Sequence, residues 1–144
     1  MIRPMLFEDR DSALRVWLRA SCAAHSFMPP AFWEEQLPFV RDICLPQCLN
    51  FVFVEEPAGP VLGFASLREA DGCLGGLFVD PAWQGRGVGS RLFGLARRIC
   101  PRLHAVVYVE NVRAVAFYAR QGMCATARRA DPATGHDQWI MRLP

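Results

Sequence analysis

Three glycines at alternate positions, Gly85, Gly87 and Gly89, constrain this chain more than any other feature of its sequence. Before them, the apolar run 77–79 predicts a strand, which Asp80-Pro81 ends because proline has no N–H for a sheet ladder. After them, apolar residues recur at helical spacing. A glycine loop that opens a helix presents free N–H groups and the positive end of the helix dipole. The stretch therefore predicts an anion site suited to phosphate.

Two common phosphate-binding patterns are absent from this loop. The P-loop pattern needs a lysine, and the chain contains none. The dinucleotide pattern G-x-G-x-x-G fails as well, because its last position falls on Ser90 or Leu92 instead of glycine. A nicotinamide-dinucleotide module stays an alternative, since Glu110 follows Gly89 by roughly twenty residues. Against it, four strands precede this loop where such a module has one.

The loop does match Gln-x-x-Gly-x-Gly, at Gln84, Gly87 and Gly89, directly after a strand that ends in Val79-Asp80-Pro81. This pattern resembles the acetyl-CoA-binding segment of the GCN5-related N-acetyltransferase (GNAT) family, and the chain resembles the small, single-domain bacterial members. The resemblance implies that the loop holds the CoA pyrophosphate and that the preceding strand lies along the pantetheine arm. A glycine-rich connection without a ligand is the alternative, and the cost of ordering three glycines disfavours it.

A second stretch carries the same resemblance through Asn111, Ala114, Phe117-Tyr118 and Gly122. The resemblance implies that Asn111 hydrogen-bonds the cofactor and that Tyr118 points at the thioester sulfur, as general acid or hydrogen-bond donor. From the residues alone, Asn111 also suits a helix N-cap and Tyr118 also suits an ordinary core. The implied catalytic residue is Tyr118, and the implied cofactor-binding residues are Leu77, Phe78, Val79, Gln84, Gly85, Arg86, Gly87, Val88, Gly89, Ser90 and Asn111.

The resemblance implies a reaction in which the acetyl group of acetyl-CoA passes to a primary amine by direct attack in a ternary complex. The acceptor stays open between a protein lysine, a protein N-terminus and a small-molecule amine. Backbone amides at Phe78 or Val79 would polarise the thioester carbonyl. A non-catalytic acyl-CoA sensor of the same fold is the alternative, which the intact Asn111 and Tyr118 disfavour.

The general base is not evident from the sequence. Some members of the family place a glutamate five residues ahead of the asparagine, where this chain has Val106. Glu110 is one candidate, although it also suits a solvated acid. His25 is another, because Ala24-His25-x-Phe27 resembles a segment of small bacterial members, although a lone histidine is more often structural. The candidate acceptor-site residues are His25, Phe27, Trp33 and Glu110, of which the aromatic ones equally suit the core.

Composition sets further expectations. The 144 residues, 52% hydrophobic and 21% charged, predict one globular domain over 1–144. A net charge of +2 is too small to indicate a nucleic-acid partner, and no apolar run reaches the ~18 residues of a membrane span. Six scattered cysteines predict buried thiols in a reducing cytoplasm, without a metal site. We expect a cytoplasmic protein, and its oligomeric state stays open between a monomer and a homodimer.

The predicted elements follow the order β α α β β β α β α β β. Early hairpins and a later crossover predict an α/β (α+β) fold with a mixed central sheet of six or seven strands and helices on both faces, by resemblance the acyl-CoA N-acyltransferase fold. Gly75-Gly76 predicts either a bulge or a close approach by a ligand in the strand before the glycine loop, and the resemblance implies a bulged strand that splays from its parallel neighbour. The predicted strands are 2–6, 50–55, 61–68, 73–80, 104–110, 124–129 and 137–143, and the predicted helices are 9–24, 31–45, 87–99 and 111–121.

Overall fold

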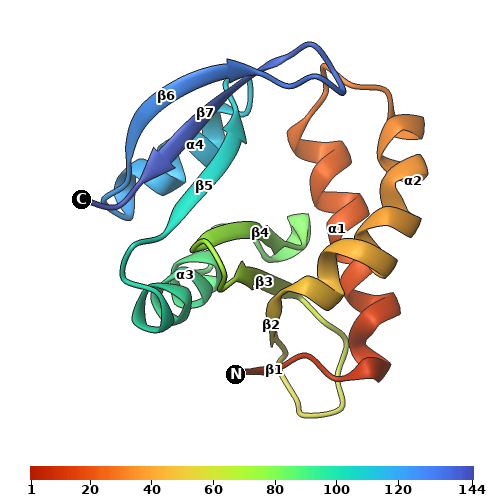
Figure 1. Cartoon of the computed structure of the whole chain (residues 1–144). Helices are drawn as coiled ribbons and strands as arrows, with labels where there is room; N and C mark the ends of the chain where they lie inside the picture. The colour runs from red at the N-terminus through yellow and green to blue at the C-terminus, as the bar shows by residue number, and fades with distance from the viewer.

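A seven-stranded sheet organises the molecule, with its strands in the order β1-β2-β3-β4-β5-β7-β6 (Figure 1). The computed structural model describes residues 1–144. Neighbouring strands are antiparallel except β4 and β5, which are parallel, so the predicted mixed sheet is confirmed with seven strands. The strands are β1 (Ile2–Pro4), β2 (Leu49–Phe53), β3 (Gly63–Arg68), β4 (Cys73–Val79), β5 (His104–Tyr108), β6 (Cys124–Ala130) and β7 (Asp137–Arg142).

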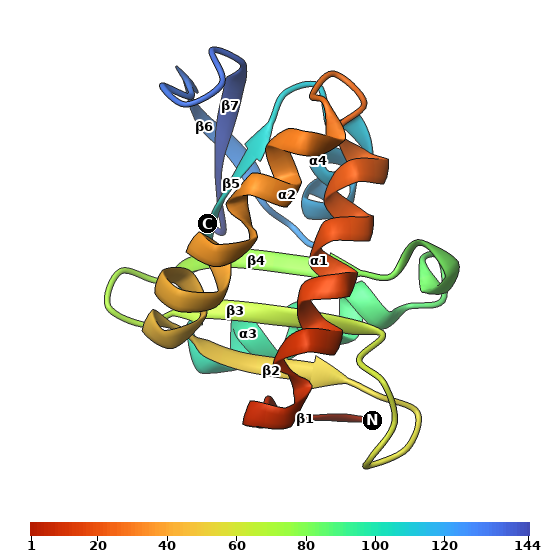
Figure 2. The ribbon, with the colours of Figure 1, turned by 90° about the vertical axis from the view of Figure 1, so that its right-hand side faces the viewer.

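Two pairs of helices cover opposite faces of this sheet, as the sequence predicted. The helices are α1 (Arg10–Ala24), α2 (Pro30–Phe39), α3 (Val88–Ile99) and α4 (Val112–Arg120). Helices α1 and α2 bury one core around Trp17, Trp33 and Phe64, while α3 and α4 bury the other around Leu92 and Phe93. Figure 2 shows α1 and α2 in front of β2, β3 and β4, with α3 behind them. None of the helices combines the length and the apolar character that a membrane crossing requires.

The predicted order of elements is confirmed, but the predicted end of the second helix is wrong, and the first strand ends two residues early. The helix expected over 31–45 is α-helical only to Phe39, and Val40–Cys44 form a π-helical turn, η2. Pro38 accounts for the change, because it has no N–H and its ring crowds the carbonyl one turn earlier. The first strand stops at Pro4, since the Leu6 N–H donates to the Asp9 carboxylate and turns the chain. Other ends move by at most two residues.

Strand β4 parts from β5 almost at once. The two strands pair only at Cys73 and His104, and they diverge beyond that point (Figure 1). On its other edge β4 pairs with β3, where Ser66 lies opposite Gly76 and Leu67 opposite Leu74. Gly75 is therefore an extra residue, and the predicted bulge is confirmed. The divergence leaves one edge of β4 without a strand partner along most of its length.

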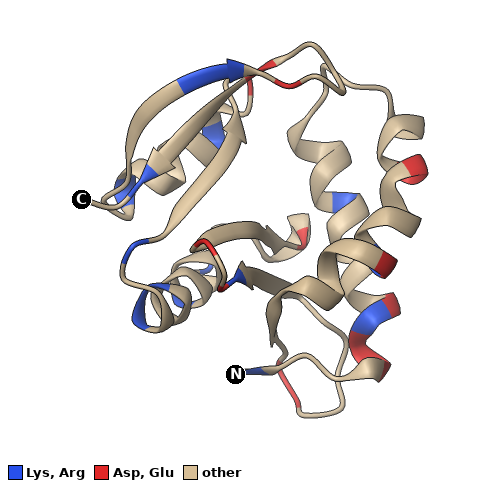
Figure 3. Ribbon diagram, viewed as in Figure 1, with Lys and Arg blue, Asp and Glu red and all other residues tan.

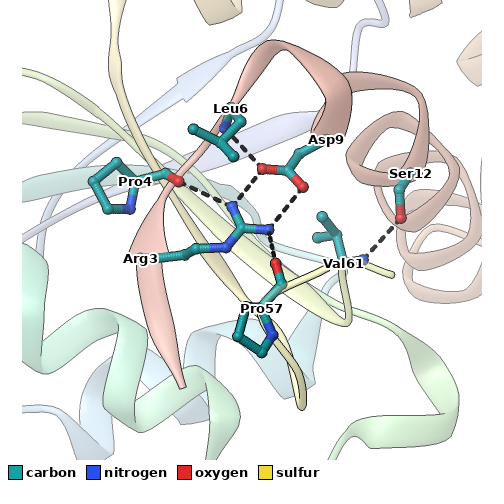
Figure 4. A network of polar contacts seen from close by, with 7 residues as sticks. All are labelled: Arg3, Pro4, Leu6, Asp9, Ser12, Pro57 and Val61. Atoms are coloured by element: carbon teal, nitrogen blue, oxygen red, sulfur yellow. Dashed lines mark hydrogen bonds and ion pairs between the residues drawn. The ribbon is translucent and has the colours of Figure 1, made fainter. Parts of the chain in front are cut away.

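A partly buried ion pair joins the first strand to the residue that precedes the first helix (Figure 4). The Arg3 guanidinium contacts both carboxylate oxygens of Asp9, at 2.6 and 3.0 Å, and donates to the Pro57 carbonyl at 2.9 Å. The hydrogen bond from Arg3 is the largest cause that holds the pKa of Asp9 below its usual value. Nearby, Ser12 Oγ accepts from the Val61 N–H at 2.8 Å. The contacts fix α1 against β1 and the β2–β3 loop.

Candidate active site

A cavity of about 500 Å³ opens where β4 and β5 diverge, between the glycine loop, α4 and the end of α1. Its lining includes Tyr118 and every predicted cofactor-binding residue except Arg86. Of the predicted acceptor-site residues, His25 and Glu110 line it, while Phe27 and Trp33 do not. The structure thus brings most of the predicted site residues together in one cavity, although their roles stay predictions.

The glycine-loop end of the cavity is built from backbone. Gly85 and Gly87 have φ values of +78° and +82°, a left-handed conformation that favours glycine, and open space surrounds the position that a Cβ would take at either one. No side chain caps α3, whose first intrahelical bond runs from Arg91 N–H to Gly87 O. The first-turn N–H groups of α3 therefore stay free for an anion, which fits a phosphate group.

Free amides also line the unpaired edge of β4. The Asp80 N–H donates to Leu62 O on the β3 side at 2.8 Å. Since amides alternate in direction along a strand, the N–H of Val79 points to the opposite side, into the divergence. The Val79 carbonyl on that same side accepts from Gln84 Nε2 at 3.1 Å. Gln84 therefore braces the loop against β4, and the Val79 amide faces the cavity, which favours Val79 over Phe78 as a donor to an acyl oxygen.

The turn between β4 and the glycine loop is held by a pair that the sequence did not predict. The buried Asp80 accepts from the Ala82 N–H at 2.9 Å and pairs with Arg19 Nη1 at 2.7 Å. The two residues are 61 positions apart, so no local pattern reveals the contact. Arg19 comes from α1, and the pair therefore fixes the start of the loop relative to that helix.

Cations gather beside the glycine loop. Arg113 and Arg120 of α4 line the cavity, and the sequence analysis missed them. Their spacing of seven residues, two helical turns, was the available signal. Helix α4 carries arginines and no acidic residue (Figure 3), which suits an anionic ligand in the cavity. Arg86, in contrast, stacks over the Trp83 ring at 4.6 Å and lies outside the cavity lining.

Tyr118 is buried where the cavity meets the core. Its ring packs against Phe93 and Phe117, with centroids 6.3 and 5.4 Å apart. Burial raises the pKa of its hydroxyl above the usual value, so the group stays protonated at neutral pH. The hydroxyl makes no hydrogen bond with the protein and belongs to a residue of the cavity wall. The geometry thus provides a proton donor without an internal acceptor.

Asn111 is the N-cap of α4, which is one of the two roles predicted for it, beside cofactor binding. Its Oδ1 accepts from the Ala114 N–H at 3.2 Å. Its Nδ2 lies 3.3 Å from His25 Nε2, and His25 Nδ1 lies 2.9 Å from the Ser21 carbonyl. His25 is 9% exposed, and burial lowers the pKa of its ring, against the opposing effect of the Ser21 bond. The imidazole is therefore neutral at pH 7.

Aromatic rings pack around His25. Trp33 stacks on it at a centroid distance of 4.7 Å, while Phe27 and Tyr108 meet it edge-on. Tyr108 donates to Asp131 at 2.5 Å, and burial is the largest cause that raises the pKa of Tyr108 to about 12. This cluster belongs to the wall behind His25, which explains why Phe27 and Trp33 lie outside the cavity lining.

Glu110 is the acidic residue of the cavity wall. Its Oε1 lies 2.7 Å from His136 Nδ1 in the loop between β6 and β7, and both side chains are partly exposed. Val106 stands at the β5 position that the resemblance associates with a glutamate. No group of three His, Cys, Asp or Glu side chains is placed to hold a metal ion.

Comparison with known proteins gives a consistent result. The sequence profile described as "Acetyltransferase (GNAT) family" matches residues 13–123. The whole chain is 32% identical to a peptidyl-lysine N-acetyltransferase, YiaC, of Escherichia coli K12, of which it covers 97%. The solution structure of apo YjaB from Escherichia coli superposes with a TM-score of 0.85 at 29% identity, over 99% of this chain and 95% of that one. An N-acetyltransferase from Thermoplasma acidophilum, solved with coenzyme A, shares the fold, with a TM-score of 0.80 at 15% identity over 99% of this chain and 97% of that one.

Proposed function

Since the chain belongs to the GNAT family of acetyl-CoA-dependent acetyltransferases, we propose that it acetylates lysine side chains of proteins. The observation that carries the acceptor is the match, over the full chain, to a peptidyl-lysine N-acetyltransferase. The cavity suits acetyl transfer to an amine, because an uncapped helix N-terminus and a single wall carboxylate, Glu110, line one space. The chain then acts as one catalytic domain.

Acetyl-CoA supplies a thioester from which an amine can take the acyl group directly, in a ternary complex. The free amides of Val88, Gly89 and Ser90, together with Arg113 and Arg120, would hold its phosphates. The open edge of β4 would hold its pantetheine arm by backbone hydrogen bonds. Asn111 has one N–H left for that arm after its two internal bonds.

Tyr118 is the residue we assign to the leaving group. A departing thiolate needs a proton or a hydrogen bond, and the buried Tyr118 hydroxyl has one to give and no competing acceptor in the protein. The Val79 N–H would donate to the acyl oxygen and stabilise the charge that develops there. The hydrogen bond from Gln84 to the Val79 carbonyl holds this residue in place.

The acceptor must lose a proton before it attacks. An ammonium with a pKa near 10.4 costs about 4.6 kcal/mol to deprotonate at pH 7. Glu110, whose partly exposed carboxylate lines the cavity, would attract this cation and pass its proton to solvent. Val106 leaves the β5 position without any acid that could share this task.

A peptide assay with mass detection tests the acceptor. Three peptides differ only at the amine: one has a blocked N-terminus and a single lysine, one has arginine in place of that lysine, and one has the arginine with a free N-terminus. We expect the mass of one acetyl group on the first alone. Acetylation of the third alone would instead assign an α-amine acceptor, and no acetylation of any would point to a small molecule. Mass detection avoids thiol reagents, which would also titrate the six free cysteines.

A further inference from the structure

We infer that His25 is a positioning residue for Asn111, whose side-chain amide it locks in the orientation that both caps α4 and presents an N–H to the cavity. The inference rests on the proposed use of this cavity for acetyl-CoA. It assigns to His25 a role in cofactor binding through another residue, and no contact with the reacting atoms.

Two backbone groups fix the polarity of this hydrogen-bonded chain. The Ser21 carbonyl can only accept, so the Nδ1 atom of His25 carries the proton. The neutral ring then has a lone pair on Nε2. At the other end the Ala114 N–H can only donate, so the atom of Asn111 that faces it is Oδ1 and the atom that faces His25 is Nδ2. The two assignments were reached independently, and they agree.

The ring of His25 cannot turn away from this arrangement. Trp33 stacks on one face with an interplanar angle of 27°, and the edges of Phe27 and Tyr108 close the sides. The imidazole is thus fixed by packing as well as by Ser21. A side chain held this firmly can impose an orientation on a neighbour at little further entropic cost.

The contact also crosses the divergence of the sheet. His25 follows α1, which packs on β3 and β4, whereas Asn111 follows β5 and begins α4. The residues are 86 positions apart. Their hydrogen bond therefore sets the start of the helix that carries Tyr118 relative to the wall opposite, which is where a cofactor arm must fit.

The same geometry argues against His25 as the general base. Its Nε2 lone pair is directed at Asn111, and its Nδ1 proton is directed at a carbonyl, so neither nitrogen is free for an amine. The groups that face the ring are the Ser21 carbonyl from α1, Trp33 from α2, Tyr108 from β5, and Phe27 and Asn111 from the connecting segments. The pair of Glu110 and His136 lies beyond Phe27. Protonation of Nε2 would set two donors against each other and release Asn111.

A double-mutant cycle measured by calorimetric titration with acetyl-CoA tests this coupling. His25→Ala and Asn111→Ser should each weaken acetyl-CoA binding by roughly 2- to 10-fold, the range of one hydrogen bond, and the double variant should bind no more weakly than Asn111→Ser alone. His25→Gln, which can still accept from Asn111, should recover most of the affinity. Additive losses would overturn the inference, as would a His25→Ala variant with normal affinity and a reduced kcat at saturating acetyl-CoA, the behaviour of a base.

A second measurement keeps the inference testable if the variants fold poorly. Nitrogen-15 NMR of the wild-type protein should show His25 with a protonated Nδ1 and a bare Nε2, and the Asn111 amide signals should shift when His25 titrates. A protonated Nε2 at neutral pH would refute the arrangement. Neither result depends on lysine transfer, so failure of the proposed acceptor would appear separately, in the peptide assay.

Discussion

The two ends of the cavity are built in different ways. At the glycine-loop end, the ligand-facing groups are backbone amides of one continuous segment, freed by left-handed glycines and an uncapped helix. At the other end, the ligand-facing groups are the side chains of Asn111 and Tyr118, and His25, from a separate segment, supports Asn111 through tertiary packing. The difference separates tasks: the backbone end suits binding of a common phosphate group, while the side-chain end suits chemistry on a particular acceptor.

The largest effect should come from a charge placed at the backbone end. Gly87→Glu sets a carboxylate against the phosphate site and forces a side chain into a left-handed backbone that costs about 1–2 kcal/mol. We expect acetyl-CoA binding to fall by more than about 100-fold, which corresponds to about 2.7 kcal/mol. Calorimetric titration measures the loss.

The matched control for this variant is Gly135→Glu. Gly135 lies in the β6–β7 loop, also has a positive φ, of +75°, and also has open space at its Cβ position, but it does not line the cavity. This change repeats the strain and the charge without the phosphate site, and acetyl-CoA affinity should be retained. Equal losses in both variants would show that strain alone explains the first result.

The next largest effect concerns turnover and comes from Tyr118, at the side-chain end of the cavity. Tyr118→Phe should lower kcat by about 100-fold or more while acetyl-CoA affinity and the free energy of unfolding change little, because the hydroxyl has no protein partner to lose. Tyr108→Phe is the contrasting variant, since it breaks a hydrogen bond to Asp131 and should cost about 1 kcal/mol of stability. Steady-state kinetics and urea unfolding distinguish the two. Normal turnover of Tyr118→Phe would remove this residue from the mechanism.

A smaller effect should appear at the junction of the two ends. Asp80→Ala removes the cap of the turn and the partner of Arg19, for a loss of stability of about 1–2 kcal/mol, because Arg19 is largely exposed and keeps its solvation. Acetyl-CoA affinity should fall with it, as the loop loses its anchor on α1. Asp71→Ala breaks an exposed pair with Arg68 and serves as the control, with little change in either quantity. If both variants behaved alike, the Arg19 pair would have no special part in loop placement.

The smallest effect is a pH dependence that only the side-chain end carries. Unfolded histidine titrates near pH 6.5, and burial lowers the pKa of His25 in the folded protein. Between these two pKa values the unfolded chain binds more protons, so the free energy of unfolding falls as pH drops below about 6.5. Urea unfolding at pH 7.5 and 5.5 should show a decrease that is smaller in His25→Gln. His104, whose pKa is also lowered by burial, is the control: His104→Gln should leave the contribution of His25 in place.

The sequence predicted the backbone end of the cavity better than the side-chain end. The glycine loop, its flanking strand and helix, and the cap at Asn111 are local patterns, and the structure has them where they were expected. The pairs of Arg19 with Asp80 and of His25 with Asn111 span 61 and 86 residues, and no spacing rule connects such positions. The end of α2 was predicted wrongly for another reason. The apolar spacing over 31–45 indicated one continuous helix, and the prediction gave too little weight to Pro38, which interrupts it.

The bulge at Gly75 shifts by one residue the alternation of β4 side chains between the two faces of the sheet. In a regular strand, residues three apart face opposite sides, yet Leu74 and Leu77 both pack into the core under α3 and α4. Phe78 consequently turns to the α1 face, against Trp17 and Phe64. Removal of Gly75 would restore the frame and exchange the two faces, and the Val79 amide would then point into the ladder with β3. A single residue thus decides which amides of β4 face its open edge, and therefore whether the Val79 N–H is available to a ligand.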